Sequence, residues 1–152
     1  MKNIAGAPGT VTGLILRVIQ CCFAAGSIVA MSTSRHFYYV TAFCYLIASM
    51  SLQVIWSSTL ASLDAYSIAQ KKIIHNHFVV SFFVVGDWVI ATLSLAAAAS
   101  SAGITVLYFS DLGDCGLNAD CAKFELAVAL AFMSWITIAI SSLIMFWILA
   151  AN

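Results

Sequence analysis

Four long apolar stretches, separated by short polar segments, make up most of the chain. They are Val11–Met31, Tyr39–Leu63, Phe78–Ser101 and Leu126–Ala150, with 21, 25, 24 and 25 residues. A helix needs roughly 20 apolar residues to cross the hydrocarbon core of a bilayer, so each stretch can span it, the longer ones with some tilt. The pattern predicts an all-α, polytopic membrane four-helix bundle that takes up residues 1–152 as a single domain.

Composition agrees with a membrane protein. Hydrophobic residues make up 63% of the chain and charged residues 8%, against about 45–50% and about 25% in soluble domains. A soluble domain of 152 residues could not bury four such stretches. The formal net charge is zero and no basic cluster stands out, so we expect membrane lipid as a partner and no nucleic acid.

The orientation follows from the positive charges of the loops. An even number of spans places both termini on one side of the membrane. With cytoplasmic termini, the inner segments hold Lys2, Lys71 and Lys72, and the outer loops hold Arg35 and Lys123. This three-to-two division favours cytoplasmic termini, because positive residues gather on the cytoplasmic side.

Two cysteines in the loop before the last stretch support the same orientation. Cys115 and Cys121 lie in the segment CGLNADC. Loop cysteines at this spacing can close a small disulfide on an oxidising side of the membrane. A metal site formed with Asp114 and Asp120 is the alternative, but a disulfide explains the cysteines more simply, and we expect no metal.

Arg17 and Asp87 are single charges inside the first and third stretches. A charge at the centre of a membrane helix costs about 2.5–3.5 kcal/mol on insertion scales, so intramembrane charges usually pair. Arg17 lies six residues after Val11 and Asp87 nine after Phe78, which is about 9 and 13.5 Å of helix. Because the long arginine stem can span that difference, we predict an intramembrane ion pair. In the alternative, Arg17 reaches the inner headgroups, and Asp87 is protonated or bonds a hydroxyl.

Gln53 is the polar residue of the second stretch that lies at a comparable depth, ten residues before Leu63. It either joins the Arg17–Asp87 pair in a polar network or bonds a neighbouring serine. Both outcomes suit an amide inside a helix bundle.

Small and polar residues recur every three or four positions along three of the stretches. Such stripes let helix backbones approach closely and let hydroxyls bond across the interface. We expect the stripe of the fourth stretch, Leu126–Ala150, to provide spare packing surface for self-association. The stripes are Gly13, Arg17, Gln20, Ala24 and Ser27; Asp87, Ala91, Ser94, Ala98 and Ser101; and Ala127, Ala131, Ser134, Ile138 and Ser141.

Signals for enzyme chemistry are poor. His36, His75 and His77 lie at the edges of the stretches, where they could not serve as axial haem ligands within helices. No C-x-x-C redox pair is present. We therefore predict a protein that is not an enzyme and has no catalytic, cofactor-binding or metal residues.

Three segments carry a resemblance to a known family. They are FCYLIASMSLQVIWSSTLASLDAYSI, FVVGDWVIATLSLAAAASSAGITVL and VALAFMSWITIAISSLIMFWILA. Together they resemble the plant Casparian-strip membrane-domain-protein-like family, which is related to the MARVEL four-helix proteins. Arg17 and Asp87 match the paired charged positions of that family, and Cys115 and Cys121 match the cysteines of its second outer loop. The first outer loop is only STSRHFY, so the chain resembles members outside the group that builds the strip.

The resemblance implies a multi-pass scaffold of the plasma membrane. Such a protein forms homo-oligomers and hetero-oligomers with relatives, excludes other membrane components and recruits cell-wall-modifying enzymes. The alternative is a small channel or transporter that uses Arg17, Asp87 and Gln53 as a polar pathway. Transporter sites usually come with broken helices, and none of the four stretches contains proline, which favours the scaffold.

Overall fold

The computed structural model describes residues 10–34, 39–70, 77–110 and 119–151. They form four α-helices, and this part of the chain contains no strand. All four are long and apolar enough to cross a membrane, so the predicted all-α membrane architecture is confirmed. The helices are α1 (Val11–Ser32), α2 (Thr41–Gln70), α3 (His77–Ser110) and α4 (Ala119–Ala150).

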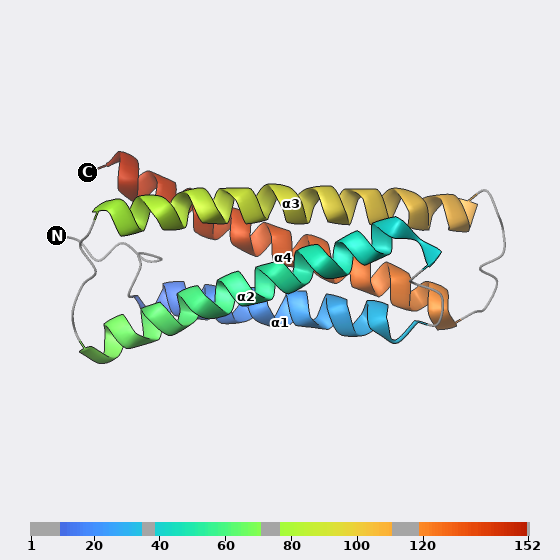
Figure 1. Ribbon diagram of the computed structural model, residues 1–152, viewed down its shortest axis with the longest axis horizontal. Helices are drawn as coiled ribbons and strands as arrows, with labels where there is room; N and C mark the ends of the chain where they lie inside the picture. The colour runs from blue at the N-terminus through green and yellow to red at the C-terminus, as the bar shows by residue number, and fades with distance from the viewer. Residues whose placement is uncertain (1–9, 35–38, 71–76, 111–118, 152) are drawn as a thin grey trace.

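The helices run alternately up and down and form a bundle (Figure 1). Both α1 and α3 pack mainly against α2 and α4, so α1 and α3 face each other across the diagonal of the bundle. The first turn of α1 and the last turn of α4 lie at the same end (Figure 1). Which end faces the cytoplasm stays a prediction, since Lys2, Arg35, Lys71 and Lys72 lie outside the described residues.

Three helices extend by seven or more residues beyond one end of their apolar stretches. α2 continues past Leu63 to Gln70, α3 continues past Ser101 to Ser110, and α4 begins at Ala119 instead of Leu126. The end of α2 is held by packing, because Asp64, the first residue after the second apolar stretch, is buried with Ser67 on the inner face. The start of α4 is held by Phe124, whose ring stacks on that of Phe43 at 4.8 Å.

The interior contains a large cluster at one end of the bundle and two small ones at the other. Ala24, Ala97, Ala98, Ala127 and Ala131 surround the large side chains of the main cluster. Alanine at these positions lets the backbones approach closely, which is how membrane helices gain packing energy. The large side chains among them are Met31, Phe43, Leu46 and Met50.

All three stripes of small and polar residues lie on the buried faces of their helices. Hydroxyls on these faces bond across the helix contacts. Ser27 Oγ donates to Ala127 O at 2.8 Å and Ser101 Oγ to Ala42 O at 3.2 Å. The α4 stripe is therefore part of the core, and our expectation that it provides spare surface for self-association is wrong.

Candidate functional site

Arg17 and Asp87 meet across the diagonal of the bundle. Arg17 Nη1 donates to Asp87 Oδ1 at 2.8 Å and Nη2 to Oδ2 at 2.5 Å. Asp87 is fully buried, and only 2% of Arg17 is exposed. This contact is bidentate: two parallel N–H groups of the guanidinium donate to the two oxygens of the carboxylate, which is among the strongest forms of charged hydrogen bonding. The structure thus places Arg17 toward Asp87 and not toward the headgroups.

Trp56 of α2 gives Asp87 a third hydrogen bond. Its indole Nε1 donates to Asp87 Oδ1 at 2.8 Å. The ring can reach that position because the residue before Asp87 is glycine. A Cβ added to Gly86 would lie 2.1 Å from Trp56 Cζ2, far inside any real contact. Gly86 therefore allows α2 to bond the carboxylate of α3.

Gln20, one turn after Arg17 on α1, links the ion pair to the other helices. Its Oε1 accepts from Ser57 Oγ of α2 at 3.2 Å and, at the long distance of 3.5 Å, from Arg17 Nη1. Its Nε2 donates to Thr137 O of α4 at 3.1 Å. A single amide thereby connects α1, α2 and α4 at the depth of the charges.

Gln53 bonds a serine and has no direct contact with the charges. Its Nε2 donates to Ser134 Oγ of α4 at 2.6 Å, and Ser134 Oγ donates to the backbone oxygen of Gln20 at 3.4 Å. Gln53 thus reaches the network through one intermediate. Its Oε1 is buried and has no hydrogen-bond partner in the part of the chain that is described.

The arrangement holds two opposite charges and surrounds them with neutral donors and acceptors. The side chains come from all four helices, and we call this set the polar network: Arg17, Gln20, Gln53, Trp56, Ser57, Asp87 and Ser134. Its net charge is zero, so it can stay dry inside a membrane. Removing one charge would leave the other buried and unpaired, which typically costs 3–5 kcal/mol, about the stability of a small domain.

The remaining residues singled out from the sequence lie elsewhere or outside the described part. Within the described residues, Cys21, Cys22 and Cys44 are the free thiols, and Cys121 at the start of α4 is not one of them. Cys115 lies outside the described residues, so the Cys115–Cys121 bond stays a prediction. His36 and His75 also lie outside. No group of three His, Cys, Asp or Glu side chains able to hold a metal occurs among the described residues.

Two members of the network, Trp56 and Ser57, were not singled out from the sequence, and Gln20 and Ser134 appeared there only as stripe residues. The signal for Gln20 was its position three residues after Arg17 on the same face of α1. For Trp56 the available signal was Gly86, a glycine that precedes the charged residue within a helix. Gly86 indicates a close contact with α2, but the sequence does not say which residue of α2 faces it. The packing of the two helices determines that residue.

Comparison with known proteins assigns the chain to a family. Residues 6–137 match the model of the Casparian strip membrane protein domain. The chain is 62% identical to CASP-like protein 5B3 of Arabidopsis thaliana over 99% of both chains. It is 52% identical to CASP-like protein 5B3 of Oryza sativa over 99% of both. With CASP-like protein 5B1 of Ginkgo biloba it is 53% identical over 100% of this chain and 85% of the other.

No solved structure matches the chain. The family model covers most of its length, including both members of the Arg17–Asp87 ion pair, and the Arabidopsis relative aligns with it almost from end to end. This four-helix membrane protein therefore belongs to the Casparian strip membrane protein family.

Proposed function

We propose that the protein is a plasma-membrane scaffold that self-associates with its own copies and with relatives, organises a membrane domain and recruits cell-wall-modifying enzymes. The observation that carries this proposal is the closed core. The polar network directs its charges inward and neutralises them, so the outer surface of the bundle is apolar and fits against lipid or another bundle. Family membership supports a membrane role of this kind. The proposal includes cytoplasmic termini and no enzymatic activity.

The face that we assign to self-association lies between α3 and α4. Val84, Val85, Trp88, Val89, Thr92 and Phe146 line a groove there with a volume of about 270 Å³. We call it the α3–α4 face. Its large side chains point outward, with more than half of Val85, Trp88, Val89 and Phe146 exposed, and it replaces the α4 stripe as the surface on which two bundles meet.

Trp88 is the reason to place a second copy on this face. The apolar span of α3 is Val80–Leu107, and Trp88 lies about 8 Å of helix from its midpoint, inside the hydrocarbon core. Tryptophan favours the membrane interface, where its indole N–H finds a partner. The N–H of Trp88 has no partner among the described residues. A neighbouring bundle could supply the acceptor.

Counting subunits in a membrane tests the scaffold. The full chain, fused to a fluorescent protein and placed in supported membranes at low density, should bleach in several steps at single spots. A distribution of single steps alone would contradict self-association and with it the scaffold. Crosslinking in native plant membranes, followed by mass spectrometry, should then recover copies of the chain, its relatives and wall-modifying enzymes.

The channel or transporter alternative would use Arg17, Asp87 and Gln53 for conduction. Arg17 and Asp87 form an ion pair with each other, so neither charge is available to a transported ion. The helices α1, α2 and α3 are continuous, whereas transporter sites usually come with broken helices. Among Arg17, Asp87 and Gln53, only Gln53 has a buried polar atom without a hydrogen-bond partner in the described residues, its Oε1, and a polar pathway would explain that atom. Solute or ion flux in proteoliposomes, abolished by Asp87→Asn in folded protein, would favour the transporter over the scaffold.

A further inference from the structure

The hydrogen-bond donor on the α3–α4 face has a chemical counterpart on the outer surface of α2. Ser58 is exposed there, and its Oγ donates its proton to Ile55 O at 2.9 Å. The lone pairs of that hydroxyl oxygen are left to accept a hydrogen bond, whereas the indole of Trp88 can only donate one. The indole has no partner among the described residues, so the two groups complement each other.

The two groups lie at nearly the same depth in the membrane. The hydrogen bond from Trp56 to Asp87 joins α2 and α3 at one level, and these helices run in opposite directions (Figure 1). Ser58 lies two residues past Trp56 on α2, and Trp88 lies next to Asp87 on α3. Ser58 and Trp88 are therefore roughly 5 Å apart along the bundle. Side chains in a helix lean toward its N-terminus, which brings the indole of Trp88 closer to the level of Ser58.

Ser58 points away from α3. Residues in a helix are turned by about 100° each, so Ser58 is turned by about 200° from Trp56, whose indole bonds α3. The α3–α4 face of the same copy therefore lies on a different side of the bundle. A hydrogen bond between Trp88 and Ser58 can form only between two copies. Copies with the same orientation in a membrane can form it, because the depths match.

The helix surface beside Ser58 leaves room for an indole ring. Small residues follow it at helical spacing: Ala61, Ser62 and Ala65. Thr59 is also exposed, and its hydroxyl donates to Ile55 O at 2.8 Å. Its neighbours at helical spacing are large: Trp56, Leu63 and Tyr66. Ser58 is therefore the more accessible of the two acceptors.

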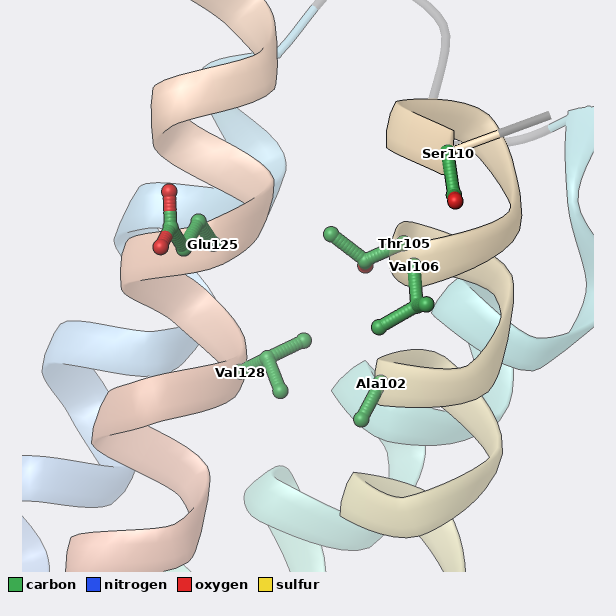
Figure 2. Close-up of a pocket in the computed structure, with 6 residues that line it drawn as sticks. All are labelled: Ala102, Thr105, Val106, Ser110, Glu125 and Val128. Carbon is green, nitrogen blue, oxygen red and sulfur yellow. The ribbon is translucent and has the colours of Figure 1, made fainter. Parts of the chain in front are cut away.

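The other cavity between α3 and α4 lacks such a pair of groups. Its volume is about 440 Å³, and it lies where α3 ends and α4 begins. Figure 2 shows the carboxylate of Glu125 on the side of α4 away from α3, and Thr105 with its methyl group toward the gap. The groove beside Trp88 is therefore the better place for a hydrogen bond to another copy.

We propose that the α3–α4 face of one copy binds the outer surface of α2 on the next copy, with Trp88 Nε1 donating to Ser58 Oγ. This inference rests on the proposed scaffold function and adds the second surface of the contact. The contact is heterologous, because the two copies use different surfaces, and each copy keeps one surface for a further copy. Copies therefore add one after another, so a membrane domain can grow from this chain.

Mixing two blocked variants distinguishes this contact from a symmetric one. Trp88→Leu removes the donor and keeps Ser58, whereas Ser58→Leu removes the acceptor, fills the space beside it and keeps Trp88. Each variant alone, with its own fluorescent colour in supported membranes, should bleach mostly in single steps. The mixture retains one working contact, so it should give two-colour spots with one step in each colour.

A symmetric contact between two α3–α4 faces gives a different result. Ser58→Leu alone would then still bleach in two steps, and the mixture would give no two-colour spots above background. Either result overturns the proposal and leaves the scaffold standing, provided that the unmutated chain bleaches in several steps. Single steps from the unmutated chain would overturn the scaffold as well.

Removal of single hydroxyls locates the hydrogen bond. Ser58→Ala should raise the surface density at which half of the copies associate by about three- to tenfold, the effect of one hydrogen bond between membrane helices. Thr59→Val and Thr92→Val are the matched controls, since both hydroxyls are exposed and Thr92 lies in the groove itself. Both should leave that density unchanged. An effect of either control as large as that of Ser58→Ala overturns the proposal.

The melting temperature in detergent excludes a folding defect. Ser58, Thr59, Trp88 and Thr92 are all exposed, so each variant should melt close to the unmutated chain. If Ser58→Leu melts lower, Ser58→Ala takes its place in the mixture. Association by Ser58→Ala that equals that of the unmutated chain then overturns the proposal.

Discussion

At the scale of the residue, the Arg17–Asp87 pair decides whether the core can exist in a membrane. Asp87→Asn would keep the shape of the side chain and an acceptor for Trp56, but would leave the buried guanidinium unpaired. We expect it to lower the free energy of unfolding in detergent by about 3–5 kcal/mol. The exchanged pair, Arg17→Asp with Asp87→Arg, should recover part of that loss. If the exchanged pair melts no higher than the worse single variant, the two charges do not stabilise each other.

Gly86 allows a second test at the same site. A Cβ at this position overlaps the ring of Trp56, so Gly86→Ala should displace the indole, break its bond to Asp87 and destabilise the protein by about 1–3 kcal/mol. Gly103 is the matched control on the same helix, since a Cβ there meets nothing within 4 Å. Gly103→Ala should be neutral or stabilising by up to about 1 kcal/mol, because alanine favours helix over glycine.

Tryptophan fluorescence and a double-mutant cycle read out the mechanism. The tryptophan emission spectrum of the Gly86→Ala variant should differ from that of the unmutated protein, and the spectrum of the Gly103→Ala variant should not. In a Trp56→Leu background the cost of Gly86→Ala should shrink, because the overlapping ring is gone. Equal costs with and without Trp56 would show that another contact limits the space at Gly86.

The sequence predicted part of this site well. One charge on each of two apolar helices, at similar depth, was enough to expect Arg17 and Asp87 to meet, because few alternatives exist for a charge in hydrocarbon. For Gln53 the sequence left two partners possible, the ion pair or a serine, since an amide can form hydrogen bonds with any polar neighbour at its depth. It could not find Trp56, because the rotation of α2 against Gly86 depends on the packing of whole helices.

At the scale of the element, the buried faces were predictable and the helix ends were not. The stripes repeat at helical spacing, and all three are buried. Helix ends depend on single contacts at the edge of the membrane. Asp64 is typical of a loop, yet it lies on the buried face of α2, and Phe124 extends α4 by stacking on Phe43. Hydropathy reports the span in lipid, whereas packing decides how far the helix continues beyond it.

The loop between α3 and α4 carries the prediction of a Cys115–Cys121 disulfide. The bond would close a small loop, so its loss in Cys115→Ser should cost less than about 3 kcal/mol and leave the four helices assembled. Mass spectrometry of non-reduced protein after thiol labelling should find both cysteines unlabelled. The exposed thiols Cys22 and Cys44 should be labelled and serve as positive controls. Labelling of Cys115 and Cys121 in unreduced protein would contradict the bond.

At the scale of the whole molecule, the side chains of the polar network point into the bundle, so two copies can associate only through the packing of their outer surfaces. Bundles in lipid gain little from the hydrophobic effect, since lipid tails are as apolar as the helices, so close contacts and hydrogen bonds decide whether two copies meet. The α4 stripe cannot serve, because it is already used inside the bundle. Ala131→Leu with Ser134→Leu should therefore unfold the monomer, where a variant at a true interface would only separate the copies.

The α3–α4 face gives the matched experiment. Trp88→Leu should shift the bleaching steps of single spots toward one while leaving the melting temperature nearly unchanged, because Trp88 is more than half exposed in the isolated bundle. Trp147→Leu is the control: Trp147 is even more exposed, but it lies about 17 Å of helix from the midpoint of the α4 span, at the membrane interface, where its N–H can bond water or headgroups. It should keep the multi-step distribution. If both variants keep it, copies meet on another face; if both lose it equally, aromatic surface in general drives association and the indole N–H of Trp88 has no special part in it.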